Sequence, residues 1–283
     1  MIGLLVAGHG SSDVAGADQF RLLADRVGKR LAADDVPVAG GFIELSAPPI
    51  RDAVAELVAS GARRLAVVPL TLVSAGHAKG DIPAALARER RRHPGLTVAY
   101  GRPLGPHPTV LAVLRQRLAA LDAGPDTTVL LVGRGSTDPD ANAEVAKTAR
   151  LLAETTPLAG VEYAFVSLAP PDTVTGLDRC RRLGASRIVV LPYFLFTGVL
   201  PRRVARQATD WGAGNPSVSV SCAEVIGDCA ELADVVLERY REALAGDLRM
   251  NCDTCLYRTP LPGHEHRLAA PQTPHHHPHD HSH

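Results

Sequence analysis

The sequence has no excess of charge of either sign and no long apolar run. Lys and Arg together number 30, and Asp and Glu also number 30. Without a basic excess, nucleic acid and membrane surfaces are disfavoured as partners. No apolar run approaches the roughly 18 residues of a membrane-spanning helix, and the first residues lack the charged segment of a signal peptide. We therefore expect a cytoplasmic protein.

Cysteine is also scarce. Five Cys in 283 residues are few and odd in number, which argues against a secreted disulfide scaffold and favours reduced thiols. Hydrophobic residues make up 46% of the chain, enough to bury one large core or two modest ones. The length predicts about two domains.

An internal duplication organises the chain. Three segments recur in the same order: 5–12 (LVAGHGSS) as 130–137 (LLVGRGST), 42–45 (FIEL) as 165–168 (FVSL), and 61–70 (GARRLAVVPL) as 184–193 (GASRIVVLPY). The offsets, 125, 123 and 123 positions, are nearly constant. Ordered matches of this kind indicate two copies of one domain-sized unit.

Each copy alternates short apolar runs with amphipathic stretches. In the first copy the predicted strands are 2–7, 38–45, 65–70 and 96–100, and helical spacing connects apolar residues such as Phe20, Leu23, Val27 and Leu31. This alternation predicts an α/β protein with two tandem, doubly wound, flavodoxin-like parallel sheets and a cleft between them. The expected divisions are 1–123, 124–245 and a tail, 246–283.

The tail has a different composition from the rest. It contains Cys252, Cys255, several prolines and eight of the twelve histidines. Such a segment buries little apolar area, so we expect it to be mobile unless a metal or a partner fixes it. The two cysteines have the spacing at which two thiolates reach one metal or form half of an iron-sulfur cluster site, and a disulfide is a comparable alternative.

The first candidate for chemistry is His9, which lies between Gly8 and Gly10 directly after the first predicted strand. The glycines permit a tight turn, and ligands bind at this edge of such sheets. The loop could instead bind phosphate, although GxGxxG spacing and the P-loop lysine are missing. A purely structural histidine is the other alternative.

His77 follows the third predicted strand. Strands one and three of such a sheet are usually adjacent, so we expect His77 and His9 to lie together. Two imidazoles suit Co, Ni, Fe or Zn, and one can also accept a proton near neutral pH. Asp81 could orient His77 as a hydrogen-bond acceptor, or it could cap the following helix.

Glu44 ends the second predicted strand within an otherwise apolar run. A carboxylate there is costly to desolvate unless it is paired or bound to metal. We therefore expect a third ligand or a proton acceptor, with a salt-bridged or edge-exposed glutamate as the alternative.

The second copy lacks these side chains: Arg134, Ser167 and Val199 or Leu200 stand where the first copy has His9, Glu44 and His77. Their joint loss indicates one shared task and one site per chain. Arg134 is suited to an acidic ligand because guanidinium binds carboxylate through two hydrogen bonds. Other candidates near predicted strand ends are Arg102 and Ser11, and, either as helpers or as solvated surface charges, Lys79, Arg202 and Arg203.

These motifs resemble the type II tetrapyrrole chelatases, the sirohydrochlorin cobaltochelatase and ferrochelatase group of the CbiX and SirB kind. The similar elements are Gly8-His9-Gly10-Ser11, Phe42-Ile43-Glu44-Leu45, Gly76-His77 and Asp81-Ile82-Pro83. The resemblance covers about residues 1–245 and extends into the tail. There the sequence Met250-Asn251-Cys252-Asp253-Thr254-Cys255 and the histidines are similar to the end of longer CbiX proteins.

The resemblance implies insertion of a divalent metal into sirohydrochlorin without ATP or an additional protein subunit. The sequence leaves a monomer and a homodimer both open. The resemblance makes His9 and His77 metal ligands and pyrrole proton acceptors, with Glu44 as their partner. It favours Co²⁺ for cobalamin over Fe²⁺ for sirohaem. A metallochaperone or metal-storage protein remains an alternative of another class, and a two-lobed periplasmic binding protein is disfavoured by the lack of an export signal.

Overall fold

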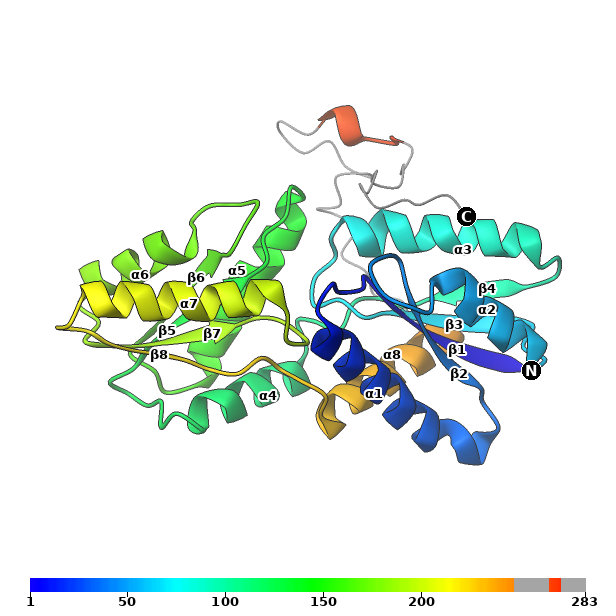
Figure 1. The fold of residues 1–283 in the computed structure, drawn as a ribbon, viewed down its shortest axis with the longest axis horizontal. Helices are drawn as coiled ribbons and strands as arrows, with labels where there is room; N and C mark the ends of the chain where they lie inside the picture. The colour runs from blue at the N-terminus through cyan, green and yellow to red at the C-terminus, as the bar shows by residue number, and fades with distance from the viewer. Residues whose placement is uncertain (247–264, 271–283) are drawn as a thin grey trace.

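A computed structural model describes residues 1–246 and 265–270 of the chain (Figure 1). Two parallel four-stranded sheets have the orders β2-β1-β3-β4 and β6-β5-β7-β8. Their strands are β1 (Ile2–Gly8), β2 (Val38–Phe42), β3 (Arg64–Pro69), β4 (Thr97–Tyr100), β5 (Thr128–Gly133), β6 (Gly160–Phe165), β7 (Arg187–Pro192) and β8 (Ser219–Cys222). The identical order in the two sheets confirms the predicted duplicated α/β architecture.

Helices follow the strands in both halves. They are α1 (Val14–Leu31), α2 (Ile50–Ala59), α3 (Ile82–Arg92), α4 (Pro108–Ala119), α5 (Pro139–Thr155), α6 (Thr173–Arg182), α7 (Val199–Gly214) and α8 (Ala230–Ala245). Short helical turns cover Ala32–Asp34, His77–Asp81 and Glu265–Arg267. In α1 the predicted apolar face is buried as expected, since Phe20, Leu23 and Val27 are almost inaccessible.

The predicted strand 38–45 ends earlier than its apolar run, at Phe42. The chain turns sharply after Glu44, where the N–H of Ser46 donates to the carbonyl oxygen of Glu44 at 2.7 Å. Between them Leu45 has a φ of 60°, in the left-handed region that few non-glycine residues adopt. Glu44 therefore lies in the loop after β2 rather than at the end of the strand.

Each sheet is covered on one face by a helix from the other half. Helix α8, at the end of the second half, packs against β3 and β4 of the first sheet and against α1. Helix α4, from the first half, packs against β7 of the second sheet and against α5, and Figure 1 shows both crossings. One hydrophobic core, which includes Leu114 of α4 and Val236 of α8, runs through both halves. The two repeats thus form one interlocked body.

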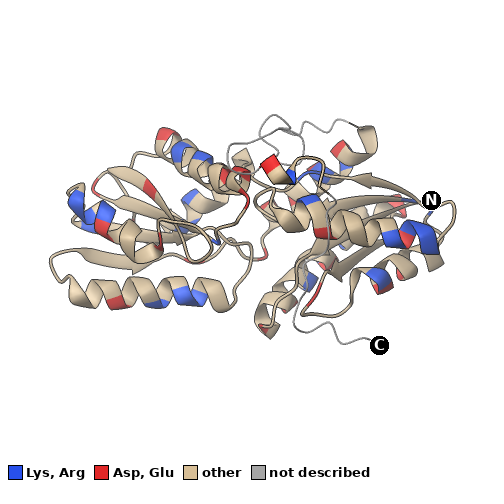
Figure 2. Cartoon of the chain, turned by 90° about the horizontal axis from the view of Figure 1, so that it is seen from above, with Lys and Arg blue, Asp and Glu red and all other residues tan. Residues whose placement is uncertain are grey.

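The described part of the chain is unexceptional in the distribution of its charged residues and in the length and apolar character of its helices. Acidic and basic residues are interspersed over the helices of both halves in Figure 2. Among residues 1–246 and 265–270, no helix combines the length and apolar character needed to cross a membrane. Cys252 and Cys255 lie outside the described residues.

Candidate active site

The loop after β1 brings His9 against Glu44. Gly10 has a φ of 102°, and a Cβ atom there would lie 1.7 Å from the carbonyl oxygen of Glu44, so only glycine fits. The N–H of Glu44 in turn donates to the carbonyl oxygen of His9 at 3.0 Å. As a result, His9 Nδ1 lies 3.2 Å from Glu44 Oε1.

His77 begins a turn of π-helix that leads into α3, rather than lying in an irregular loop. Its Nδ1 atom lies 2.6 Å from Oδ2 of Asp81, one π-helical turn later. The backbone of Asp81 is helical and its side chain makes no capping hydrogen bond to α3, so the capping alternative is wrong; the contact with His77 is the geometry that the orienting alternative requires. Inserted π-helical turns are often found at functional sites.

The two imidazoles meet at the carboxyl ends of β1 and β3, which pair directly. Their ring centroids are 4.1 Å apart, with the planes tilted by 53°. The side chain of His9 is 26% exposed and that of His77 is 13% exposed, so solvent reaches both. The expectation that neighbouring strands bring His9 and His77 together is confirmed.

Each imidazole therefore has a carboxylate beside its Nδ1 atom, Glu44 for His9 and Asp81 for His77. Such a carboxylate fixes the tautomer and orientation of a ring and makes its other nitrogen more basic. Across residues 1–246 and 265–270, no three His, Cys, Asp or Glu side chains form a ready-made metal cluster. The arrangement offers two imidazole donors that can bind a metal or accept a proton.

Arg134 extends this group from the second half. It occupies the position of His9 in that half, and Gly135 after it has a φ of 85°, matching Gly10. The surrounding protein lowers the pKa of the Arg134 guanidinium, although its side chain still reaches solvent, and the charge of Glu44 acts against this shift. Arg134 is therefore electrostatically coupled to Glu44, the carboxylate beside His9.

Two of the remaining basic candidates, Arg102 and Lys79, pair with carboxylates. Arg102 makes two hydrogen bonds to the carboxylate of Glu242 on α8, at 2.7 and 2.9 Å. Arg203 is exposed on α7. Lys79 is only 7% exposed and pairs with two aspartates of the second half, so its interpretation as a solvated charge is wrong.

Ser11 stabilises the loop that carries His9. Its hydroxyl accepts the N–H of Asp13 at 3.0 Å, and its own N–H donates to Ser46 Oγ at 3.0 Å. Asp13 then caps α1 by accepting the N–H of Gly16. The structure thus gives Ser11 a role in holding the loops after β1 and β2 together.

Two exposed leucines were missed by the sequence analysis. Leu45 follows Glu44, and Leu168 follows Ser167 at the same position of the second half. Both have positive φ, 60° and 64°, and both are about half exposed or more. Strained, exposed apolar residues are concentrated at functional sites, and the repetition of this leucine in both copies was the signal for it in the sequence.

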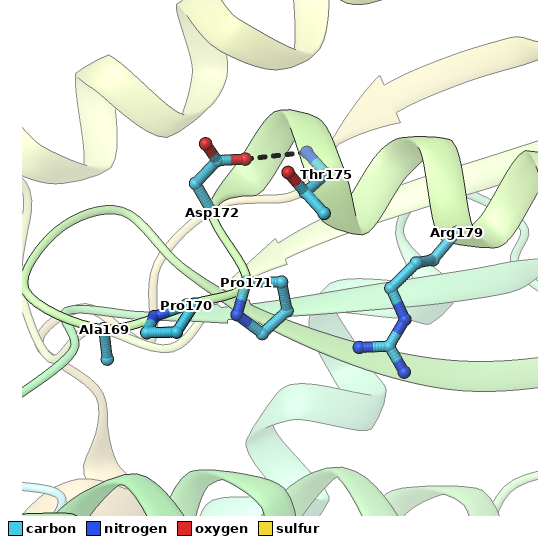
Figure 3. Close-up of a pocket in the computed structure, with 6 residues that line it drawn as sticks. All are labelled: Ala169, Pro170, Pro171, Asp172, Thr175 and Arg179. Carbon is cyan, nitrogen blue, oxygen red and sulfur yellow. Dashed lines mark hydrogen bonds between the residues drawn. The ribbon is translucent and has the colours of Figure 1, made fainter.

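Two surface hollows lie away from the histidines. One, of about 610 Å³, lies at the start of α6 and is lined by Pro171, Asp172 and Arg179 (Figure 3). There Asp172 caps the helix by accepting the N–H of Thr175 at 2.7 Å. The other, of about 510 Å³, runs along α1 and the edge strand β2. Neither contains a histidine.

Comparison with known proteins matches the fold and the duplication. A family model described as CbiX matches residues 3–121 and again residues 128–243. A sirohydrochlorin cobaltochelatase from Priestia megaterium is 36% identical over 269 residues, which cover 93% of this chain and 87% of the relative. A sirohydrochlorin ferrochelatase from the same species is 35% identical over 210 residues, 73% of this chain and 78% of the relative.

A solved structure has the same architecture. SirB from Bacillus subtilis with Fe³⁺ superposes with a TM-score of 0.74 at 31% identity, covering 87% of this chain and 96% of that one. The similarity therefore spans both sheets and the helices that cross between them.

Proposed function

The chain belongs to the CbiX family, and we propose that it inserts a divalent metal ion into sirohydrochlorin without ATP. The observation that carries this function is the pair His9 and His77, with ring centroids 4.1 Å apart and a carboxylate beside each ring. Both relatives named above act on sirohydrochlorin according to their names, one with cobalt and one with iron.

The proposed mechanism uses the imidazoles both as ligands and as bases. A tetrapyrrole must lose two N–H protons before the metal enters, and a base positioned within hydrogen-bond reach accelerates such transfers. Asp81 accepts the Nδ1 proton of His77, which leaves the Nε2 lone pair for a metal or a pyrrole proton. The Glu44 carboxylate, with Oε1 3.2 Å from His9 Nδ1, stabilises the positive charge that the His9 ring gains when it takes up a proton. Two imidazoles hold the metal loosely enough to release it to the ring.

Substrate binding is assigned to the surroundings of this pair. Arg134, coupled to Glu44, binds a peripheral carboxylate of the tetrapyrrole through its guanidinium. Leu45 and Leu168 provide apolar contact for the face of the ring. Arg102 contributes less, because Glu242 already occupies its guanidinium, and Ser11 contributes through the loop that it holds.

We propose Co²⁺ as the physiological metal, with Fe²⁺ as the alternative, since imidazole donors accept both ions. The two curated relatives carry one metal each in their names. Storage or delivery of metal without turnover is a second candidate function, favoured by the eight histidines of residues 246–283.

The deciding experiment is turnover. Purified protein is mixed with sirohydrochlorin and Co²⁺ or Fe²⁺, and the absorption change is compared with that of the His9→Ala and His77→Ala variants. We expect a rate about 100-fold or more above both variants, the usual contribution of a positioned base. If the rate equals the spontaneous rate with both metals, the enzymatic function is refuted and storage is left.

Assignments for the tail, the location and the assembly of the protein accompany this proposal. Cys252 and Cys255 bind a metal or part of an iron-sulfur cluster, and the histidines after them act as a metal reservoir. Removal of residues 246–283 then leaves turnover at saturating metal largely intact. The protein works in the cytoplasm as a monomer or homodimer, with one site per chain, because the second half has no counterpart of His9 or His77.

A further inference from the structure

Polar contacts between the two halves surround the turn that carries His77. The backbone N–H of Ser74 donates to Oε2 of Glu144 at 2.7 Å. Lys79 Nζ lies 2.7 Å from Oδ2 of Asp138 and 3.0 Å from Oδ2 of Asp140. We call these five residues the Lys79 latch. It joins the turn before α3 to the first turns of α5 in the other half.

A reciprocal set of contacts joins the halves in the opposite direction. The N–H of Thr197 donates to Gln19 Oε1 at 2.9 Å, and Arg202 pairs with Asp13. We call these four residues the Arg202 latch. The positions correspond through the duplication: Ser74 to Thr197 and Lys79 to Arg202 at 123 positions, Asp13 to Asp138 and Gln19 to Glu144 at 125.

The two latches differ in burial. Lys79 and its two aspartates are all 10% exposed or less, whereas in the other latch Asp13 is 7% exposed but Arg202 is 51% exposed. An ion pair with both partners buried is costly to break because the remaining charge loses both water and partner, while a pair with one solvated partner is screened and contributes less. Only the Lys79 latch is therefore expected to constrain its surroundings strongly.

The Lys79 latch holds His77 from both sides along the chain. Ser74 lies three residues before His77 and Lys79 two residues after it, and both are bound to α5. The start of α5 is itself fixed, since Asp138 Oδ1 caps it by accepting the N–H of Asp140 at 3.1 Å. Contacts with a helix of the other half thus fix the position of His77.

We propose that the Lys79 latch positions His77 against His9, so that the second half serves metal transfer although it holds neither imidazole. This rests on the proposed function. We assign the latch side chains no contact with the metal or the tetrapyrrole. They act through the placement of one ring, which has to be held to within about 0.5 Å for efficient transfer.

The first test compares Lys79→Met with Lys79→Arg and with the matched Arg202→Met variant. Full-length protein is titrated with Co²⁺ and the visible absorption of bound Co²⁺ is recorded. The absorption of a His9→Ala/His77→Ala double variant is then subtracted, which removes the contribution of the other histidines. We expect about 10- to 100-fold weaker binding and a raised KM for Co²⁺ in Lys79→Met, recovery in Lys79→Arg, and less than about fivefold change in Arg202→Met. Equal effects of Lys79→Met and Arg202→Met overturn the proposal.

The second test uses Glu144→Gln, which copies the amide that Gln19 supplies in the Arg202 latch. Burial, together with Asp140 and Asp138, raises the pKa of Glu144 to about 7, while Lys79 and the Ser74 N–H oppose the shift. The buried Tyr193 hydroxyl is the other titratable group near it. We expect the Co²⁺ affinity of the natural protein to depend on pH between about pH 6 and pH 8, and we expect part of this dependence to be missing in Glu144→Gln. Superimposable pH profiles overturn the proposal.

If Lys79→Met does not fold, Asp140→Asn keeps the Asp138 pair and is expected to give a smaller loss of Co²⁺ affinity in the same direction. If Asp140→Asn binds Co²⁺ with the same affinity as the natural protein, the result counts against the latch. Failure of the proposed function has a different signature: the natural protein and the double histidine variant bind Co²⁺ alike and turn over no sirohydrochlorin.

Discussion

His77 Nδ1 and Asp81 Oδ2 lie 2.6 Å apart within a single π-helical turn, a closer contact than the 3.2 Å between His9 Nδ1 and Glu44 Oε1. Both carboxylates stand behind an imidazole, but only Asp81 belongs to the same turn as its histidine. The orientation of His77 therefore depends on one local hydrogen bond, while that of His9 depends on two neighbouring loops.

Asp81→Asn should lower the rate of metal insertion and the Co²⁺ affinity by about 10- to 100-fold, the usual effect of removing a carboxylate behind a ligating histidine. The amide keeps the shape but loses the charge that stabilises a protonated ring. Initial rates at saturating sirohydrochlorin measure the effect, with the exposed Asp52→Asn as control. An unchanged rate would show that Asp81 does not orient His77.

Arg134→Ala should raise the KM for sirohydrochlorin by about 10-fold or more and leave Co²⁺ affinity unchanged, because a charge-assisted hydrogen bond to a carboxylate contributes about 1.5–3 kcal/mol. Steady-state kinetics separate this from a loss of kcat, and Arg203→Ala on the exposed side of α7 is the control. A fall in kcat alone would contradict the assignment of Arg134 to substrate binding.

Gly10→Ala should destabilise the fold by about 2 kcal/mol or more and reduce activity. The added Cβ would lie 1.7 Å from the Glu44 carbonyl oxygen, at a φ of 102°. Urea unfolding measures the change. Gly124→Ala is the matched control, since nothing lies within 4 Å of a Cβ atom there. Similar stability of the two variants would mean that the loop after β1 rearranges freely.

The free energy of unfolding of Glu144→Gln, measured relative to that of the natural chain, should be higher at pH 8 than at pH 5. The folded-state pKa of Glu144 is about 7, above the ordinary 4.5, so its contribution is full below pH 4.5 and is lost as pH rises through 7. The pKa difference corresponds to about 3 kcal/mol. Urea unfolding at both pH values, with Glu154→Gln on the exposed side of α5 as control, tests the sign. A constant difference between pH 5 and pH 8 would contradict it.

Residues 1–123 expressed alone should not give a stable folded protein. Helix α8 covers β3 and β4 of the first sheet, so its absence exposes an apolar face of that sheet, while α4 loses the second sheet on which it packs. Circular dichroism and size-exclusion chromatography measure folding and aggregation, with residues 1–246 as control. A soluble, cooperatively unfolding fragment would refute the dependence.

The sequence predicted the meeting of His9 and His77 because strand adjacency follows from the topology of a doubly wound sheet. It left the role of Asp81 open, since a residue four positions after His77 can cap a helix or bond back to the ring. The choice depends on the backbone: Asp81 is helical and part of a π-turn, and that excludes capping.

Lys79 shows where prediction from the sequence fails. Its partners Asp138 and Asp140 are about 60 positions away and belong to the other half, so no local pattern distinguishes it from a surface lysine. The sequence did contain one signal: Lys79 and Arg202 occupy corresponding positions of the two copies, and so do Asp13 and Asp138.

The sequence by itself determined the duplication, the alternation of strands and helices, and the placement of both histidines at one edge of a sheet, because these depend on short-range periodicity and repeated motifs. Only the tertiary structure decided that α4 and α8 exchange sheets, that Arg134 lies near Glu44, and that Lys79 is buried between the halves. These features arise from contacts between residues far apart in the chain, whose burial is settled when the two halves pack together.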